Sequence, residues 1–291
     1  MIYPIVLSGP QEPGGCGAAE SLPAHFCGEE MVESRFQSLL RGLMHPMFAA
    51  PTIVACEAHR FLAVQQMQAV GASGDLLIEP GLSNSAAALA AVALRFQHDP
   101  EATLLVLPAE YSGAEGAPFY HVLEAALPEV FVGSLVLLTQ EGRGTSRYGH
   151  AQPLCRARLG EPVQALFKDA TSGASASAAL TNAGVYMVRA GSLLAAFKRY
   201  APRLLQSTKR AVEEIDARDG FLRLAPQAYD RVRREDFETA ILARMETVVA
   251  LPCEDPQQDP FADWYSDAQA DRAAATRAAG QKPATGRAIA A

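Results

Sequence analysis

The sequence predicts an α/β fold: a Rossmann-like, mixed but mainly parallel sheet with helices on both faces. Four short apolar segments alternate with helical segments between residues 2 and 107, a spacing typical of a doubly wound sheet. The first of these segments, residues 2–7, opens into a loop that contains Gly14, Gly15 and Gly17. A buried strand followed by such a loop can bring backbone N–H groups close to a phosphate, although an ordinary surface loop fits the same residues.

Composition narrows the class of protein. The chain has 291 residues, of which 49% are hydrophobic and 20% charged, so a sizeable core is available. The formal net charge is -7, and because residues 267–291 are basic the remainder carries about -9. Such an acidic body argues against nucleic acid as a partner, since phosphate contacts need a basic face. A nucleotide stays compatible, because one Mg²⁺ can offset local charge.

The cysteines and the apolar segments indicate the compartment. Five cysteines are scattered without a C-x-x-C pair, which fits reduced thiols better than a disulfide framework or a zinc site. No apolar run reaches the length of a membrane span, and no basic region precedes the first apolar stretch. We therefore expect a soluble, cytoplasmic protein that does not contact a membrane.

In the first half of the chain, predicted strands and helices alternate regularly. Leucine spacing predicts a helix over residues 30–45, and Ser83 or Ser85 can cap an alanine-rich helix that ends near residue 96. The other elements expected here are a helix at 58–70 and strands at 52–56, 75–78 and 103–107. Ligands of such sheets bind at the carboxyl ends of the strands, which selects the loops 8–17, 56–59, 79–84 and 108–111.

The second half is less regular. We expect helices at 119–127, 192–200, 202–214 and 236–245, and strands at 133–138, 148–152, 163–167, 185–188 and 248–251. The predicted domain spans residues 1–266, with a second lobe from about residue 140. Residues 267–291 are rich in Ala, Arg, Gly and Pro without a pattern, and we predict a disordered tail.

Short motifs along the chain follow one another in a recognisable order. They are Ile5-Val6-Leu7-Ser8-Gly9, Pro23-Ala24-His25-Phe26, His59-Arg60-Phe61, Glu79-Pro80 with Asn84-Ser85, Leu107-Pro108-Ala109-Glu110-Tyr111, Tyr148-Gly149 and Asn182-Ala183-Gly184. In this order the chain resembles the sugar-nucleotide pyrophosphorylases, most closely the nucleotidyltransferase domain of bacterial mannose-1-phosphate guanylyltransferases, over residues 1–264. The resemblance implies a GT-A-like fold.

The resemblance also implies site residues. The nucleotide would lie on Ser8, Gly9, Gly14, Gly15, Gly17, Glu79 and Asn84, and the sugar on Tyr148, Gly149 and Asn182. Glu110 stands where the family has a metal-binding Asp, so Glu110 and Asp259 would hold Mg²⁺. Two alternatives stay open: Asn84 can equally cap a helix, and Glu110 can be a solvated loop carboxylate.

The chain departs from the family where the chemistry takes place. Residues 10–22 contain no Lys or Arg, and Ala24 stands where the family has a Lys. Lys168 and Asp169 replace a sugar-binding Glu and a phosphate-binding Lys, which reverses both charges. Cations beside the transferring phosphorus are most of what this reaction needs. Only His25 and Arg147 could substitute for the missing ones, and we assign no catalytic residue.

Two functions follow. The first is a degenerate mannose-1-phosphate guanylyltransferase-like protein that keeps the nucleotide-sugar scaffold with weak or no turnover and acts as a regulatory or assembly subunit. The alternative is an active nucleotidyltransferase that makes a nucleoside-diphosphate sugar of the GDP-mannose type from a nucleoside triphosphate and a sugar 1-phosphate. The expected ligands are a nucleoside triphosphate or a nucleotide sugar, and the expected partners a second copy or a regulatory protein. A dinucleotide oxidoreductase ranks third, because the G-x-G-x-x-G spacing is missing.

Overall fold

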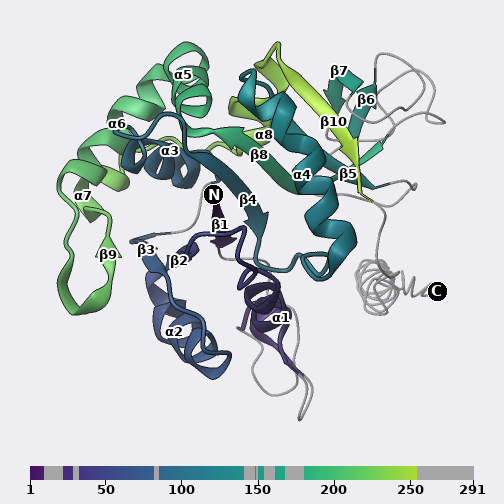
Figure 1. Cartoon of the computed structure of the whole chain (residues 1–291). Helices are drawn as coiled ribbons and strands as arrows, with labels where there is room; N and C mark the ends of the chain where they lie inside the picture. Colours follow the sequence, from purple (N-terminus) through teal and green to yellow (C-terminus); the bar gives the residue numbers. More distant parts are fainter. Residues whose placement is uncertain are drawn as a thin grey trace, which may run out of the picture. The chain divides into compact units, whose positions relative to one another are not determined.

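A mixed sheet organises the part of the chain that the computed structural model describes (Figure 1). The described residues are 1–9, 22–28, 33–81, 85–140, 148, 150–153, 161–167 and 180–253. They lie in one compact unit, Met1–Glu254. The predicted domain boundary at residue 266 and the predicted tail fall outside the described residues.

The sheet confirms the predicted fold class. Its order is β5-β10-β7-β6-β8-β4-β1-β2-β3-β9, with a further pairing between β5 and β8. The parallel half consists of β1 (Ile2–Ser8), β2 (Thr52–Cys56), β3 (Asp75–Glu79), β4 (Thr103–Pro108) and the edge strand β9 (Leu222–Arg223). The other half consists of β5 (Leu135–Gln140), β6 (His150–Pro153), β7 (Glu161–Phe167), β8 (Leu180–Arg189) and β10 (Val248–Pro252). The strand β8 joins the halves, since it pairs antiparallel with both β4 and β5.

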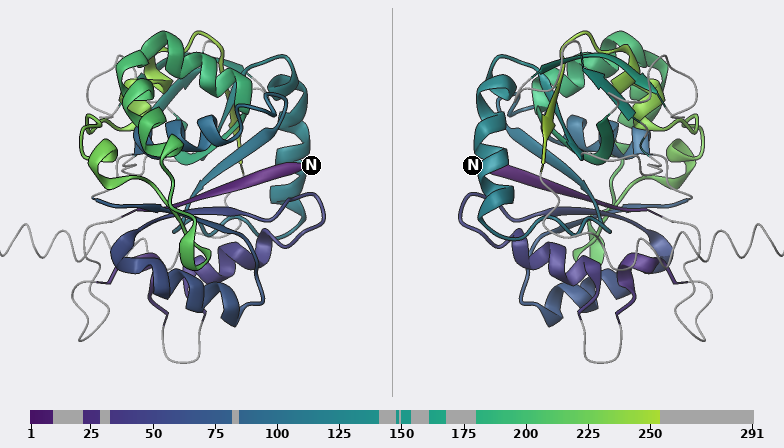
Figure 2. Two further views of the ribbon diagram at one scale, coloured as in Figure 1. Left: turned by 90° about the vertical axis from the view of Figure 1, so that its left-hand side faces the viewer. Right: turned by 90° about the vertical axis from the view of Figure 1, so that its right-hand side faces the viewer.

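Helices cover both faces of the sheet, as predicted (Figure 2). One face carries α1 (Arg35–Gly42), α2 (Arg60–Ala69) and α4 (Ala117–Phe131). The other carries α3 (Ser85–Arg95), α5 (Ala190–Tyr200), α6 (Pro202–Glu213), α7 (Pro226–Tyr229) and α8 (Phe237–Ala240). Short 3₁₀ turns lie at Ala24–Phe26, Glu57–His59, Arg218–Gly220 and Leu242–Arg244.

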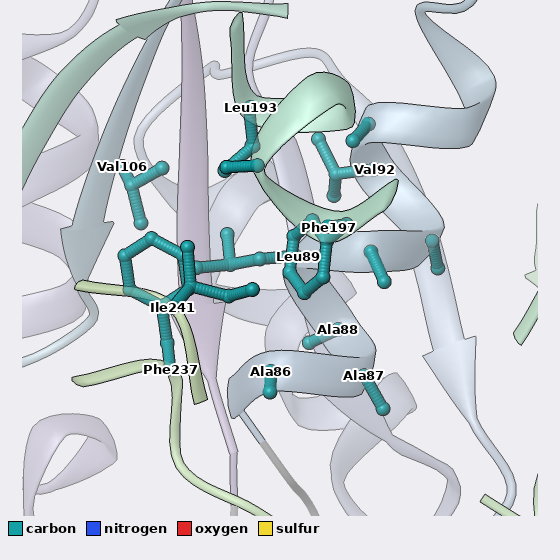
Figure 3. Packing of buried hydrophobic residues seen from close by; sticks show 14 of the residues in the cluster. Ala86, Ala87, Ala88, Leu89, Val92, Val106, Leu193, Phe197, Phe237 and Ile241 are labelled. Carbon is teal, nitrogen blue, oxygen red and sulfur yellow. The ribbon is translucent and has the colours of Figure 1, made fainter. Parts of the chain in front are cut away.

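The alternation of side chains along the strands divides the interior into two cores. In β1, Ile5 packs on the α3 side and Val6 on the α1 side. The helix α3 lies deepest, because every residue from 86 to 94 is buried. Its small alanine side chains let the large rings of Phe197 and Phe237 approach the helix closely (Figure 3).

The helix α1 starts later than the leucine spacing predicted. Helix from residue 30 is wrong, because Glu33 and Ser34 are not helical and Ser34 is the N-cap. Ser34 Oγ accepts a hydrogen bond from the Gln37 backbone N–H at 3.2 Å, and Gln37 Oε1 accepts one from the Ser34 N–H at 3.0 Å. This capping box pairs two backbone N–H groups at the start of the helix, which would otherwise have no hydrogen-bond partner within the helix.

Replacing Ser34 with Ala is expected to lower the free energy of unfolding by about 1 kcal/mol, because the cap and the 2.6 Å bond from Ser34 Oγ to Gln66 Oε1 are both lost. Urea unfolding followed by circular dichroism measures the change. Ser207→Ala, inside α6, is the control and should shift stability by less than about 0.5 kcal/mol. Equal effects of the two substitutions would show that the cap contributes nothing.

Three further elements differ from their predicted bounds. The helix α4 runs past Pro128 to Phe131, since its buried apolar face continues to Val130. The strand β8 begins at Leu180, so the Asn182-Ala183-Gly184 motif lies inside the strand rather than before it. The helix expected at 236–245 is broken, because Ile241 leaves helical geometry at φ -125°. The short elements β9 and α7 were not predicted.

Candidate functional site

A pocket of about 240 Å³ lies where the carboxyl ends of the parallel strands meet the start of α3. Gly9 follows β1, Glu79 ends β3 and Pro108 ends β4, and all three line it. The place agrees with the rule that ligands of parallel sheets bind at this edge. The complete lining is Leu7, Gly9, Val54, Glu79, Ser85, Ala88, Leu89, Pro108, Tyr148, Gly184, Tyr186, Asp236, Phe237 and Glu238.

Glu79 is a fully buried carboxylate in the wall of the pocket. The hydroxyl of Tyr229, from α7, donates a hydrogen bond to Glu79 Oε1. Burial and the charge of Glu79 raise the pKa of Tyr229 far above its ordinary value, so the hydroxyl keeps its proton and stays a donor. This bond helps the fold to tolerate a carboxylate with no exposed surface.

Tyr148 connects three of the residues that the sequence singled out. Its hydroxyl donates to Glu110 Oε1 at 2.8 Å, and its backbone oxygen accepts from Asn182 Nδ2 at 2.9 Å. Asn182 Oδ1 also accepts the Gly184 N–H at 2.7 Å. Gly184 has a φ of +73°, and a Cβ there would lie 2.6 Å from the Tyr148 ring. The kink at Gly184 therefore gives Tyr148 its place against β8.

A second tyrosine, Tyr186, lines the pocket and contacts α8. It donates to Glu238 Oε1 at 2.7 Å and accepts from Asn182 Nδ2 at 3.3 Å. Burial, followed by the charge of Glu238, raises the pKa of Tyr186 well above its ordinary value. Ser85 Oγ accepts the Phe237 N–H at 2.8 Å, which ties the start of α3 to the start of α8. Two helix starts thus meet at the same pocket.

Ser8 does not line the pocket. It is fully buried, and its Oγ lies 2.8 Å from Nε2 of the equally buried His25. Ser8 precedes and His25 follows the segment that holds the predicted glycines, so this bond joins the two ends of that segment. His25, which could have substituted for a loop cation, is buried in one cluster with the rings of Phe26 and Phe36 instead.

The structure brings part of the predicted site together. Gly9, Glu79 and Tyr148 line one pocket, while Glu110 and Asn182 bind Tyr148 from outside the lining. Six predicted site residues, and three residues named with the charge departures, lie outside the described residues. They are Gly14, Gly15, Gly17, Asn84, Gly149 and Asp259, and Arg147, Lys168 and Asp169.

Four polar residues of the pocket region were not predicted from the sequence: Tyr186, Tyr229, Asp236 and Glu238. One signal was available, because Asp236 precedes an apolar helix and is the type of residue that caps one. In the structure Asp236 Oδ1 accepts the Thr239 N–H at 2.8 Å. Tyr186 and Tyr229 read as ordinary core residues, and only the folded chain shows which carboxylates they meet.

The carboxylates of the region do not form a metal centre within the described residues, where no group of three or more His, Cys, Asp or Glu side chains is arranged around a common point. Glu110 is half-buried and receives the Tyr148 hydroxyl. Its predicted companion Asp259 is not among the described residues.

A mixed, mainly parallel sheet of this order, with a pocket at its carboxyl edge, is a Rossmann-like α/β fold. Solved structures with this fold include a mannose-6-phosphate isomerase from Helicobacter pylori, with a TM-score of 0.72 and 21% identity over 89% of this chain and 99% of that one. A protein from Thermus thermophilus described as mannose-1-phosphate geranyltransferase has a TM-score of 0.69 and 15% identity, and covers 88% of this chain and 75% of that one. These likenesses establish the fold.

The sequence relatives are more specific. The chain is similar to the mannose-1-phosphate guanylyltransferase ManC of Salmonella typhimurium, with 27% identity over 86% of this chain and 56% of the relative. The mannose-1-phosphate guanylyltransferase of Escherichia coli K12 is 26% identical over the same shares. No protein-family model matches the chain. The resemblance found from the motifs is therefore confirmed, and the chain spans about half the length of the curated relatives that it matches.

A membrane span was not expected. Among the described residues, no helix is both long enough and apolar enough to cross a bilayer.

Proposed function

We propose that this chain is a mannose-1-phosphate guanylyltransferase-like protein that keeps a nucleotide-sugar scaffold and has weak or no turnover. Its ligand is a nucleotide sugar or a nucleoside triphosphate, and it acts as a regulatory or assembly subunit. One observation carries the proposal: the described lining of the pocket contains three carboxylates, Glu79, Asp236 and Glu238, and no Lys or Arg.

The charge of the pocket opposes the reaction more than it opposes binding. Two like charges 4 Å apart repel by about 4 kcal/mol at an effective dielectric constant of 20, so a bare triphosphate is disfavoured beside these carboxylates. Hydroxyl and amino groups of a sugar or a base, in contrast, can donate to carboxylate oxygens. A nucleotide sugar carries fewer charges than a triphosphate and has such donors at both ends.

Cations from neighbouring elements do not compensate within the described residues. Arg60 and Arg223 belong to the region beside β2 and β3, yet neither lines the pocket. Both contact Glu57 instead, at 3.0 and 3.5 Å. Loss of one preorganised donor at a transferring group costs on the order of 10²–10³ in rate, so two missing cations would leave little turnover.

Mg²⁺ belongs to the same proposal. When bound, it would offset phosphate charge, and Glu110 and Asp259 are the residues that we propose to hold it. Tyr148 would then orient the Glu110 carboxylate through the 2.8 Å hydrogen bond. The metal is proposed for ligand binding and does not by itself restore the cations missing from the loop.

A pyrophosphate-release assay with Mg²⁺, GTP and mannose 1-phosphate tests turnover, and thermal shifts with GDP-mannose and with GTP test the scaffold. We expect a rate below that of a mannose-1-phosphate guanylyltransferase relative by a factor of about 10² or more. We also expect a rise in Tm with GDP-mannose that exceeds the rise with GTP. A rate comparable to that of the relative would favour the active enzyme, and no shift with either compound would refute the retained scaffold.

A matched pair of variants isolates the charge of the pocket. Glu238→Gln removes one lining charge and keeps an oxygen for the Tyr186 hydroxyl, whereas Glu246→Gln removes a charge paired with Arg199 on the surface. We expect E238Q to increase the stabilisation by GTP and E246Q to leave it unchanged. The same response in both variants would mean that the pocket carboxylates do not govern triphosphate binding.

A further inference from the structure

The surface formed by α5 and α6 is basic, although the whole chain has a formal net charge of -7. Five cations lie on these two helices: Lys198, Arg199, Arg203, Lys209 and Arg210. Arg199 pairs with Glu246 at 2.6 Å, and Lys209 pairs with Glu213 at 3.5 Å. The other three make no ion pair within the part of the chain that the structure describes. Positive charge is therefore concentrated here and only partly neutralised.

A groove of about 430 Å³ lies on this surface, lined by residues of α5 and α6 and by the carboxyl-terminal end of α3. Figure 1 shows α3, α5 and α6 as neighbouring helices. Its apolar lining is supplied by three leucines, one from each helix, and by the proline that begins α6: Leu94, Leu194, Leu205 and Pro202. Its polar lining consists of two lysines and two glutamines: Lys198, Lys209, Gln97 and Gln206. Lys198 and Lys209 come from different helices, so cations reach the groove from two sides. We call it the α3–α5–α6 groove.

The α3–α5–α6 groove is separate from the candidate functional site. The two cavities share no lining residue. They lie toward opposite ends of one helix, since Ser85 at the start of α3 lines the site and Leu94 near its end lines the groove. A ligand of the groove therefore needs no part of the nucleotide-sugar scaffold, and its binding does not depend on the proposed function.

The chemistry of the lining selects the ligand. Ammonium groups bind phosphate and carboxylate anions as point charges, and the glutamine amides can donate further hydrogen bonds. Leu194 and Pro202, with the small exposed parts of Leu94 and Leu205, offer an apolar surface that an inorganic ion cannot use. The volume lies within the usual range for small-molecule sites. A lining of apolar groups with a few polar ones fits a small molecule that is itself partly apolar and partly polar.

We propose that the α3–α5–α6 groove is a second binding site, for a small organic anion that joins a phosphate or carboxylate group to an apolar body. The anionic group lies at Lys198 and Lys209, and the apolar body rests on Leu94, Leu194 and Leu205. The acidic pocket and this basic groove thus take ligands of different charge on one subunit.

Isothermal titration of the full chain with phenyl phosphate tests the proposal, with inorganic phosphate and phenol as the two halves of the probe. We expect phenyl phosphate to bind with a Kd of about 1 mM and each half to bind at least about tenfold more weakly. Lys198→Glu with Lys209→Glu should weaken phenyl phosphate by at least about tenfold. Saturation with GDP-mannose should leave the affinity for phenyl phosphate unchanged, because the two cavities share no residue.

The matched control is Arg203→Glu with Arg210→Glu, which makes the same change of net charge on the same surface outside the groove. We expect it to alter the Kd by less than about twofold. Equal losses in the two double variants would reduce the effect to general charge attraction and overturn the proposal. So would inorganic phosphate binding as tightly as phenyl phosphate, or no binding of phenyl phosphate at all. Lys198→Gln with Lys209→Gln serves if the glutamate variant does not fold.

Discussion

Replacing Phe237 with Ala is expected to lower the free energy of unfolding by about 3–5 kcal/mol, the range for large-to-small changes in a closely packed core. Phe237 is 1% exposed. Its ring centroid lies 5.3 Å from that of Tyr186 and 6.2 Å from that of Phe197, and Figure 3 shows it against the alanine-rich start of α3. The surrounding side chains relax only partly into the space left by the ring, so a cavity remains.

Urea unfolding measures this loss, and Phe131→Ala provides the control. Phe131 is 59% exposed at the end of α4, so its removal should cost less than about 0.5 kcal/mol. Phe237 also lines the candidate site, so the variant should respond less to GDP-mannose than the parent chain does. A loss below about 1 kcal/mol for Phe237→Ala would mean that the core around α3 is less closely packed than the structure shows.

Substituting Gly184 with Ala is expected to destabilise the protein by about 2 kcal/mol or more. Part of this cost is the left-handed backbone at φ +73°, which L-residues adopt at about 1–2 kcal/mol. The rest arises because a Cβ 2.6 Å from the Tyr148 ring forces that ring away, and with it the bond from the Tyr148 hydroxyl to Glu110. The variant should therefore lose ligand-induced stabilisation as well as stability.

Gly71→Ala separates the two contributions to the cost at Gly184. Gly71 has nearly the same φ, +70°, but no atom lies within 4 Å of the position its Cβ would take. Its substitution should cost about 1 kcal/mol, and the response to GDP-mannose should be that of the parent chain. Equal losses of stability at Gly71 and Gly184, with equal ligand responses, would exclude a role of the Gly184–Tyr148 contact in shaping the site.

Helices and strands that depend on neighbouring residues in the sequence were predicted more accurately than those that depend on tertiary contacts. The strand at 52–56 was predicted with its observed bounds, because a short run of buried apolar residues between turns has few other solutions. The start of α1 was missed, since the capping box of Ser34 and Gln37 outweighs the leucine spacing by which the helix was recognised. The break in the helix after residue 236 depends on Ile241 packing into the core around α3, which no window of sequence reveals.

The sequence by itself determined the fold class, the edge of the sheet at which the candidate pocket lies, and the absence of Lys and Arg from residues 10–22. Periodicity, motif order and composition are properties of the chain alone, so they could be read directly. Only the tertiary structure decided that Glu79 and Glu238 are bound by the hydroxyls of Tyr229 and Tyr186, and that Ser8 turns inward to His25. These partners are up to 150 residues apart. Packing of the helices on the sheet brings them together, and no spacing in the sequence records that packing.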